Sequence, residues 1–128
     1  MKLLHLVFGA MTLSASVAQA ALVETPLPFT VGDTEYASVL IHDDAQPAKR
    51  SILLVPNWMG INSENLAQAK LIAGRGYTVY VVDMYGAGVR PKDAAEAGAA
   101  AGVVKADLAA MHTRIQTALT TLTDQKLV

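Results

Sequence analysis

The stretch "SILLVPNWMGINSEN", residues 51–65, joins a short apolar run to an abrupt polar turn. Residues 52–55 are continuously apolar, which is typical of a strand buried on both faces in the centre of a parallel sheet. Pro56 has no N–H to donate to a neighbouring strand, so we expect the strand to end there. The turn that follows contains Trp58, the only Trp of the chain. We expect this turn to line a functional site, because ligands of open parallel sheets bind beyond the carboxyl ends of the strands.

A helix and a second apolar strand are predicted after the turn. Ser63 can cap the free N–H groups of a first helical turn, and Glu64 suits the positive end of the helix dipole. The helix is expected to run to about Ala73, and Gly76 can take the left-handed conformation that follows many helices. The expected buried stripe consists of Leu66, Ala69, Leu71, Ile72 and Ala73. The apolar residues 77–85 predict the next strand, so the pattern indicates a right-handed βαβ unit.

Upstream of this unit, residues 26–31 and 34–42 predict two strands of a β-hairpin. The dipeptide Gly32-Asp33 between them is typical of a short hairpin turn. His42 lies near the end of the second strand and is interpreted as a surface residue. Downstream, a second Gly-bearing loop follows the strand at residues 77–85, and we expect it to lie beside the Trp58 turn.

The last third of the chain contains two segments with helical patterns, and the pattern is weaker in the first than in the second. The Ala-rich residues 94–104 contain Gly98 and Gly102, so they could form a weak or broken helix or a low-complexity loop. Residues 105–122 predict a clearer helix, because apolar residues recur there at spacings of three and four. That stripe consists of Leu108, Met111, Ile115, Ala118, Leu119 and Leu122. His112 lies beside the stripe and is interpreted as solvated.

The composition narrows the possible functions. The formal net charge of −1 over 128 residues gives no electrostatic footprint for nucleic acid or an anionic membrane. The chain has no Cys, so no disulfide framework is possible. His42 and His112 are far apart in sequence and form no ligand cluster for a transition metal. We therefore expect no metal and no cofactor.

The first twenty residues have the three parts of a secretory signal peptide in order. Lys2 supplies the positive start, an apolar stretch follows, and Ala18-Gln19-Ala20 matches a small-x-small cleavage pattern. The apolar stretch is too short to span a bilayer. Residues 1–20 are therefore predicted to be a signal peptide, and residues 21–128 one small exported domain, periplasmic or secreted, with no stable membrane insertion after cleavage.

The segment "LLVPNWMGINSENLAQAKLIAGRGYTVYVVDMYGAGVRPKDAAEA" resembles the dienelactone hydrolase family of the α/β-hydrolases. Its specific features are an apolar strand, a W-x-G-x-N turn, a helix, and D-x-Y-G at the next strand end. The resemblance implies an α/β fold with a mostly parallel eight-stranded sheet, of which this chain is expected to form a part: an amino-terminal β-hairpin, a βαβ unit and a further helix. It implies hydrolysis of a small ester or lactone by a Cys (or Ser), His and Asp triad, without a cofactor.

The resemblance also assigns site residues. The backbone N–H of Trp58 is expected to contribute to the oxyanion hole, and Arg90 to grip a substrate carboxylate. Tyr85 is expected either to line the substrate pocket or to cover the core. Asn57 stands where studied members carry a Glu, and Asn cannot act as a base. Asp83 is expected to cap the turn that follows it.

The motif of the nucleophile is missing from these 128 residues. There is no Cys, and Ser38, Ser51 and Ser63 are not flanked by the G-x-S-x-G pattern. We therefore expect the chain to be the amino-terminal part of a hydrolase, truncated before the nucleophile elbow and inactive alone. The alternative is a small exported binding module that holds a carboxylate ligand through Arg90.

Overall fold

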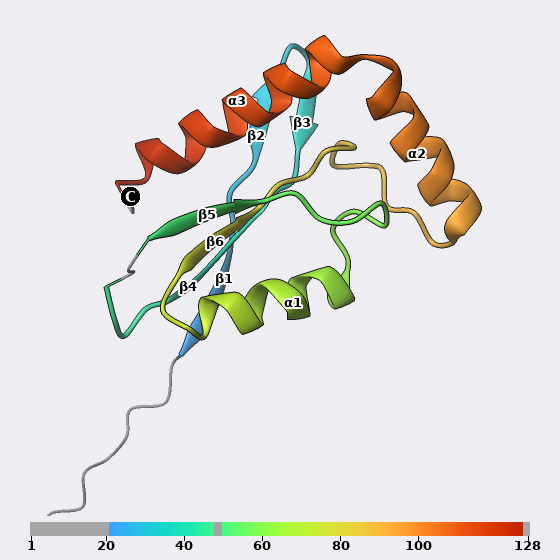
Figure 1. The fold of residues 1–128 in the computed structure, drawn as a ribbon. Coiled ribbons are helices and arrows are strands. Elements are labelled where there is room, and N and C mark those ends of the chain that lie inside the picture. Colours follow the sequence, from blue (N-terminus) through green and yellow to red (C-terminus); the bar gives the residue numbers. More distant parts are fainter. Residues whose placement is uncertain (1–20, 48–49, 127–128) are drawn as a thin grey trace, which may run out of the picture.

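The structure is a computed structural model that describes residues 21–47 and 50–126. A four-stranded sheet lies between α1 on one face and α3 on the other, and α2 leads into α3 at one end of the sheet (Figure 1). The elements are β1 (Leu22–Pro26), β2 (Phe29–Val31), β3 (Thr34–Tyr36), β4 (Val39–Asp43), β5 (Ser51–Leu54), α1 (Ser63–Ala73), β6 (Thr78–Val81), α2 (Ala94–Ala106) and α3 (Leu108–Asp124). The predicted signal peptide, residues 1–20, lies outside the described residues.

The strand order of the sheet is β1-β4-β6-β5. β5 and β6 are parallel and are joined through α1, which confirms the predicted βαβ unit. β4 pairs antiparallel with both β6 and β1. β5 pairs only with β6 and borders the sheet as described, and its four residues are half-buried, so the expected burial on both faces is not observed among the described residues. The strand that is buried along its whole length is β6.

The predicted hairpin is present only in part. β2 and β3 form a separate two-stranded sheet around Gly32, whose φ is +59°. The single strand expected at residues 34–42 is split into β3 and β4, which belong to different sheets. The break falls at Ala37 and Ser38, which both bind Asp83: the Ala37 N–H donates to the Asp83 carboxylate, and the Ser38 hydroxyl accepts from the Asp83 N–H.

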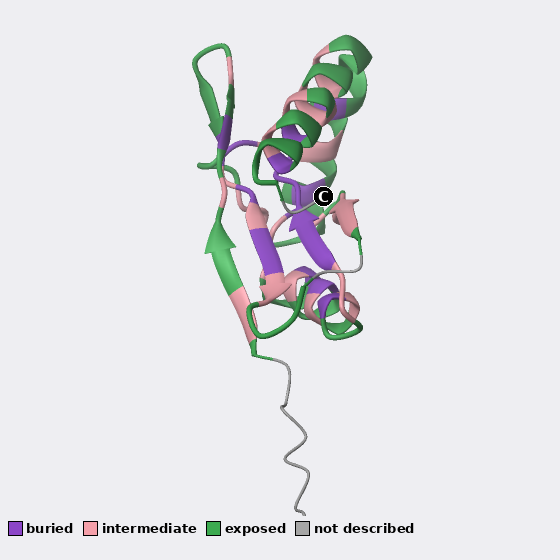
Figure 2. Cartoon of the chain, turned by 90° about the vertical axis from the view of Figure 1, so that its left-hand side faces the viewer, coloured by how far each residue is buried: buried purple, intermediate pink, exposed green. Residues whose placement is uncertain are grey.

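Side chains alternate between the two faces of β6 and so build two apolar layers. Val79 and Val81 pack toward α1, where they meet Ala69 and Ala73. Tyr80 belongs to the layer on the α3 side, which includes Ala118 and Leu122. Figure 2 shows that the buried residues concentrate in the middle of the sheet and on the inner sides of the helices. The small side chains of Ala69 and Ala73, both fully buried, allow α1 to approach the sheet closely.

Four predicted core positions are exposed, and the first of them is Val55, which follows β5 and is 48% exposed. Leu71 on α1 is 67% exposed, and Leu108 and Leu119 on α3 are 64% and 43% exposed. Leu71 lies on the outer side of α1, since the helix contacts the sheet through Ala69 and Ala73. Leu108 is the first residue of α3, where the described chain places no covering layer over it.

Helix α1 spans the predicted residues, but its cap differs. Asn62, not Ser63, is the N-cap, and its side-chain oxygen accepts a hydrogen bond from the Asn65 N–H at 2.8 Å. Gly76 has the expected positive φ, +90°.

The Ala-rich segment forms one continuous helix, α2. Asp93 caps it by accepting from the Glu96 N–H at 2.9 Å, and Glu96 accepts in return from the Lys92 N–H at 2.9 Å. These two bonds stabilise the start of a helix that contains two glycines. The predicted helix at residues 105–122 begins three residues later than expected, because Asp107 caps the first turn of α3. No helix of the described residues is long and apolar enough to cross a membrane.

The buried Tyr80 predicts a loss of stability at alkaline pH. Its hydroxyl donates to the Leu27 carbonyl at 2.7 Å, and burial raises the pKa of Tyr80 above the ordinary 10.0, partly offset by a hydrogen bond with Ser38. A tyrosine whose pKa is higher in the folded chain than in the unfolded chain stabilises the fold fully at any pH below its unfolded pKa. That stabilisation is lost as the pH rises from the unfolded pKa to the folded pKa. We therefore expect the melting temperature to fall above about pH 10 in thermal melts. An alkaline melting temperature equal to the neutral one would contradict this.

Candidate functional site

Two loops follow the carboxyl ends of the parallel strands β5 and β6. We call residues 55–62 the Trp58 loop and residues 82–93 the Asp83 loop. A hydrogen bond joins them directly: the Tyr85 hydroxyl donates to the carbonyl oxygen of Trp58 at 2.7 Å. The two loops therefore lie side by side, as the parallel arrangement of β5 and β6 predicts.

Hydrogen bonds fix the backbone of the Trp58 loop. The Gly60 N–H donates to the Asn57 carbonyl at 2.9 Å, and the Met59 N–H donates to the Asn57 side-chain oxygen at 3.0 Å. That same oxygen accepts from the side-chain amide of Asn65 at 2.9 Å. Asn57, at the position of the family's Glu, thus organises the turn through an amide oxygen and carries no charge.

The backbone N–H of Trp58 differs from those of Met59 and Gly60, which are hydrogen-bonded within the loop. Within residues 21–47 and 50–126, nothing accepts a hydrogen bond from it. The indole is 51% exposed and lies against α2, where a Cβ added at Gly98 would meet it at 3.8 Å. Gly98 thus interrupts the helix-favouring Ala run at the point where the Trp58 ring packs against α2.

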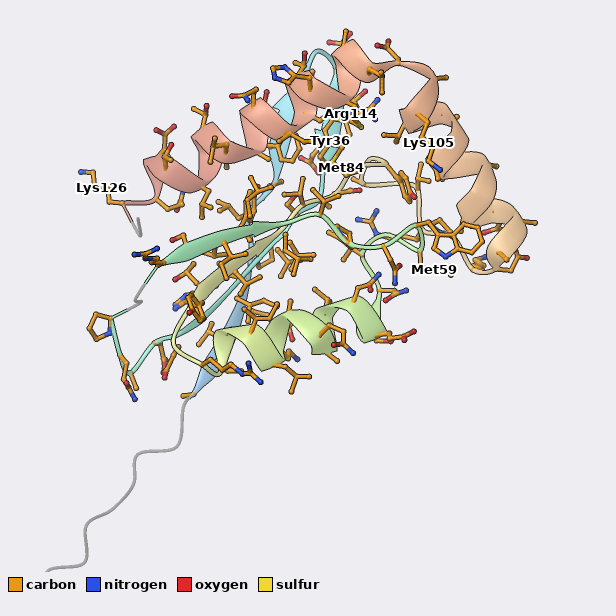
Figure 3. All side chains as sticks on the ribbon, viewed as in Figure 1. Tyr36, Met59, Met84, Lys105, Arg114 and Lys126 are labelled. Atoms are coloured by element: carbon orange, nitrogen blue, oxygen red, sulfur yellow. The ribbon has the colours of Figure 1, made fainter. Side chains whose placement is uncertain are left out.

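A cavity of about 240 Å³ lies between the two loops and the helices α2 and α3. Its lining is mostly apolar, and Lys105 of α2 is the one charged residue among the described residues that line it. Figure 3 labels Lys105 on α2 and Met84 in the Asp83 loop. The described lining consists of Val55, Pro56, Asn57, Trp58, Gly60, Met84, Tyr85, Ala101, Val104, Lys105, Met111 and Ile115.

Asp83 holds the second loop in shape from a buried position. Its side chain is 1% exposed, and one carboxylate oxygen accepts from the Tyr85 and Gly86 N–H groups at 3.0 and 3.1 Å. It therefore caps the turn, as the sequence predicts. The other oxygen accepts from the Ala37 N–H at 3.0 Å and from both terminal nitrogens of Arg90 at 3.2 Å.

Arg90 is part of the same network. Its guanidinium also donates to the carbonyls of Gly86 and Val89 at 2.9 and 2.8 Å. Arg90 lines a separate open hollow with Lys92 and Glu96, not the apolar cavity beside Trp58. Contact between Arg90 and a substrate carboxylate stays a prediction, and the structure gives this side chain a positioning role.

Tyr85 lines the cavity, one of the two locations that the sequence left open. Burial raises the pKa of its hydroxyl above 10.0, so the hydroxyl remains a donor to Trp58 at neutral pH. From the opposite side of the cavity, Arg114 of α3 donates to the Met84 carbonyl at 3.0 Å and lies over the ring of Tyr36 (Figure 3). α3 is thereby tied to the Asp83 loop and to the β2–β3 hairpin.

Lys105 is the site residue that sequence reasoning missed. The sequence predicted Lys105 as the first residue of a helix over residues 105–122, separate from the Ala-rich segment, whereas it lies in the last turn of α2. A continuous helix over residues 94–106 would have placed Ala101, Val104 and Lys105 on one side, at spacings of three and four. His42 and His112 do not line this cavity, and no three acidic or His residues among those described are grouped closely enough to hold a metal.

The parallel β5–β6 pair, the helices on both sheet faces and the two loops at the strand ends are the architecture of an α/β-hydrolase. A comparison with family models matches residues 37–127 to the dienelactone hydrolase family. The chain belongs to this family. The family and fold class predicted from the sequence are thereby confirmed.

Two solved structures resemble this one. The first, described as "m3DLH", shares 26% sequence identity with a TM-score of 0.72 over 80% of this chain and 43% of its own. The second is a dienelactone hydrolase-like promiscuous phosphotriesterase from metagenomic libraries, with 25% identity and a TM-score of 0.75 over 84% of this chain and 45% of its own. This chain thus spans less than half the length of either. No curated protein matches the sequence.

Proposed function

We propose that this protein contributes the oxyanion-hole loop and one wall of the substrate cavity to a hydrolase of small esters or lactones. The observation that carries the proposal is the backbone N–H of Trp58, which has no acceptor in the described chain and belongs to a loop that lines an apolar cavity. Membership of the dienelactone hydrolase family supports the hydrolase class.

The proposed role of Trp58 is electrostatic. When a nucleophile attacks an ester carbonyl, negative charge develops on the oxygen, and a preorganised N–H stabilises that charge. Removing one such donor typically costs about 10²–10³ in rate. Because the 128 residues hold no Cys and no G-x-S-x-G motif, we propose that they do not complete a turnover by themselves.

Lys105 supplies a basis for substrate selection. A single cation in a mostly apolar cavity favours a ligand with an apolar body and one anionic group. Lys105 is a better candidate for this role than Arg90, because Lys105 lines the cavity and the guanidinium of Arg90 is bound to Asp83. The proposed substrate is therefore a small ester or lactone that carries a carboxylate.

Phenylphosphonate tests the proposal, because its tetrahedral anion resembles the charged intermediate of ester hydrolysis and it cannot be hydrolysed as an ester. We expect it to bind the 128-residue chain and to change the fluorescence of Trp58. The variant Lys105→Met should weaken binding about tenfold, the expected effect of losing one hydrogen bond to a charged group. Lys126→Met is the matched control, since Lys126 is exposed and lies after the end of α3 (Figure 3).

Two results would contradict the proposal. Equal affinities of the Lys105→Met and Lys126→Met variants would remove Lys105 from the site. Turnover of p-nitrophenyl acetate by the 128-residue chain would show that a nucleophile is present within it.

A carboxylate-binding module remains the second candidate, favoured by the same Lys105. Stabilisation by benzoate but not by phenylphosphonate would support it over the hydrolase. Export of either protein rests on residues 1–20 and stays a prediction.

A further inference from the structure

We propose that Asn65 of α1 is a positioning residue for the oxyanion hole. The inference rests on the proposed function, because it concerns the loop whose N–H would stabilise the charge. Asn65 is not adjacent to Trp58 in sequence and does not line the cavity as described. Its effect on Trp58 is exerted through the two residues that flank the Trp58–Met59 peptide.

The side-chain amide of Asn65 makes two short hydrogen bonds to the loop. One links its nitrogen to the side-chain oxygen of Asn57 at 2.9 Å, and the other links it to the backbone carbonyl of Gly60 at 2.7 Å. Because an amide nitrogen has two hydrogens, these bonds use its full donor capacity. Asn57 precedes Trp58 and Met59 in the chain, and Gly60 follows them. The side-chain amide of Asn65 therefore holds the loop on both sides of these two residues.

The helix makes Asn65 a rigid anchor. Its own backbone N–H donates to the Asn62 side chain, and its residue is only 7% exposed. One turn further on, Ala69 is fully buried against the sheet. The packing of α1 on β4 and β6 therefore fixes the position of the Asn65 side-chain amide. The Trp58 loop is held in place relative to the sheet through its bonds to this amide.

The direction of the Trp58 N–H depends on both sides of the loop. On the amino-terminal side, Asn57 is fixed by Asn65, and on the carboxyl-terminal side the Trp58 carbonyl accepts from Tyr85. If Asn65 lost its donors, Asn57 and Gly60 would be free to move, and the N–H would no longer be held in one direction. A residue that only fills the core would not have this local effect.

The variant Asn65→Asp in the full chain separates these roles. A carboxylate cannot donate, so at neutral pH it would face two acceptor oxygens and release the loop. Loss of two buried bonds should speed hydrogen exchange of the Met59 and Gly60 amides about tenfold or more. The loop should also expose Trp58 to acrylamide quenching, which is unambiguous because Trp58 is the only Trp.

The pH dependence of this variant is the diagnostic measurement. Burial beside two carbonyl oxygens raises the pKa of an introduced carboxyl above its usual value of about 3.9. As the pH falls through that raised pKa, the protonated group can donate one bond, so the exchange rate and the quenching should return toward those of the unchanged chain. The variant Asn65→Ala should release the loop equally at neutral pH and show no such return.

Two further variants keep the outcome decisive. Gln68→Asp puts the same charge on an exposed position of α1 and should leave Met59, Gly60 and Trp58 unchanged. Asn57→Ala removes the acceptor from the exposed loop without touching the helix, so it tests the link even if changes at Asn65 prevent folding. Because Asn57→Ala also removes the acceptor of the Met59 N–H, Gly60 exchange and Trp58 quenching are the readouts of the link in this variant. Both should increase, but less than in Asn65→Ala, which also frees the Gly60 carbonyl.

Unchanged Gly60 exchange in Asn57→Ala, or unchanged exchange of Met59 and Gly60 in a folded Asn65→Asp chain, would overturn the proposal. None of these measurements requires turnover. Failure of phenylphosphonate to bind while the loop remains coupled to Asn65 would therefore reject the hydrolase site and leave the coupling intact.

Discussion

The variant Asp83→Ala is expected to lower the free energy of unfolding by about 3–5 kcal/mol, which is the typical cost of breaking a buried, hydrogen-bonded ion pair. The carboxylate is 1% exposed and accepts hydrogen bonds from three backbone N–H groups in addition to Arg90. Its removal leaves these donors without their acceptor in the protein interior. Urea unfolding followed by circular dichroism measures the change.

Two other variants locate the source of this effect. Asp33→Ala removes an exposed carboxylate in the β2–β3 turn and should change stability by less than about 0.5 kcal/mol. Arg90→Ala should cost clearly less than Asp83→Ala, because Asp83 keeps its three backbone donors and the Arg90 side chain is 35% exposed. Equal losses from Arg90→Ala and Asp83→Ala would mean that the ion pair, and not the backbone bonds, holds the Asp83 loop.

Gly60→Ala is expected to destabilise the protein by about 2–3 kcal/mol. Its φ of +68° lies in the left-handed region, where a side chain costs about 1–2 kcal/mol. A Cβ there would also meet the Tyr85 ring at 3.1 and 3.2 Å, closer than ordinary van der Waals contact. Tyr85 would have to shift, and its hydrogen bond to Trp58 would be strained.

Gly32→Ala is the matched control for Gly60→Ala. Its φ of +59° imposes a similar backbone cost, but a Cβ at Gly32 meets nothing within 4 Å. We therefore expect a loss of about 1 kcal/mol for Gly32→Ala. Melting curves of both variants give the difference, which reports the contact with Tyr85. Equal losses of stability in the two variants would show that the Tyr85 ring shifts away from the added Cβ without a measurable loss of free energy.

The sequence predicted the parts of the fold that depend on local patterns. The bounds of α1 follow from polar residues around Asn62 and from Gly74 and Gly76, and these signals are local. The division of residues 34–42 between two sheets was missed, because it depends on Asp83, which lies 46 residues beyond Ala37 in the chain. No propensity of Ala37 or Ser38 indicates such a partner.

The candidate site was predicted in the same uneven way. The positions of the Trp58 and Asp83 loops follow from the parallel strands that precede them. The pairing of Arg90 with Asp83 forms within one irregular loop, for which no periodic pattern exists. The placement of Lys105 depends on how α2 packs against the loops, which periodicity alone could not supply. Asn65 was missed because it lies within a helix and its partners lie outside it.

The border position of β5 has a geometric consequence. Its outer side carries backbone groups that can pair with one more strand, at the usual separation of about 4.8 Å. A strand added there in parallel would end on the same side of the sheet as β5 and β6, which is the side where the Trp58 loop lies. The β5 edge of the sheet is therefore continuous with the Trp58 loop, which lines the cavity.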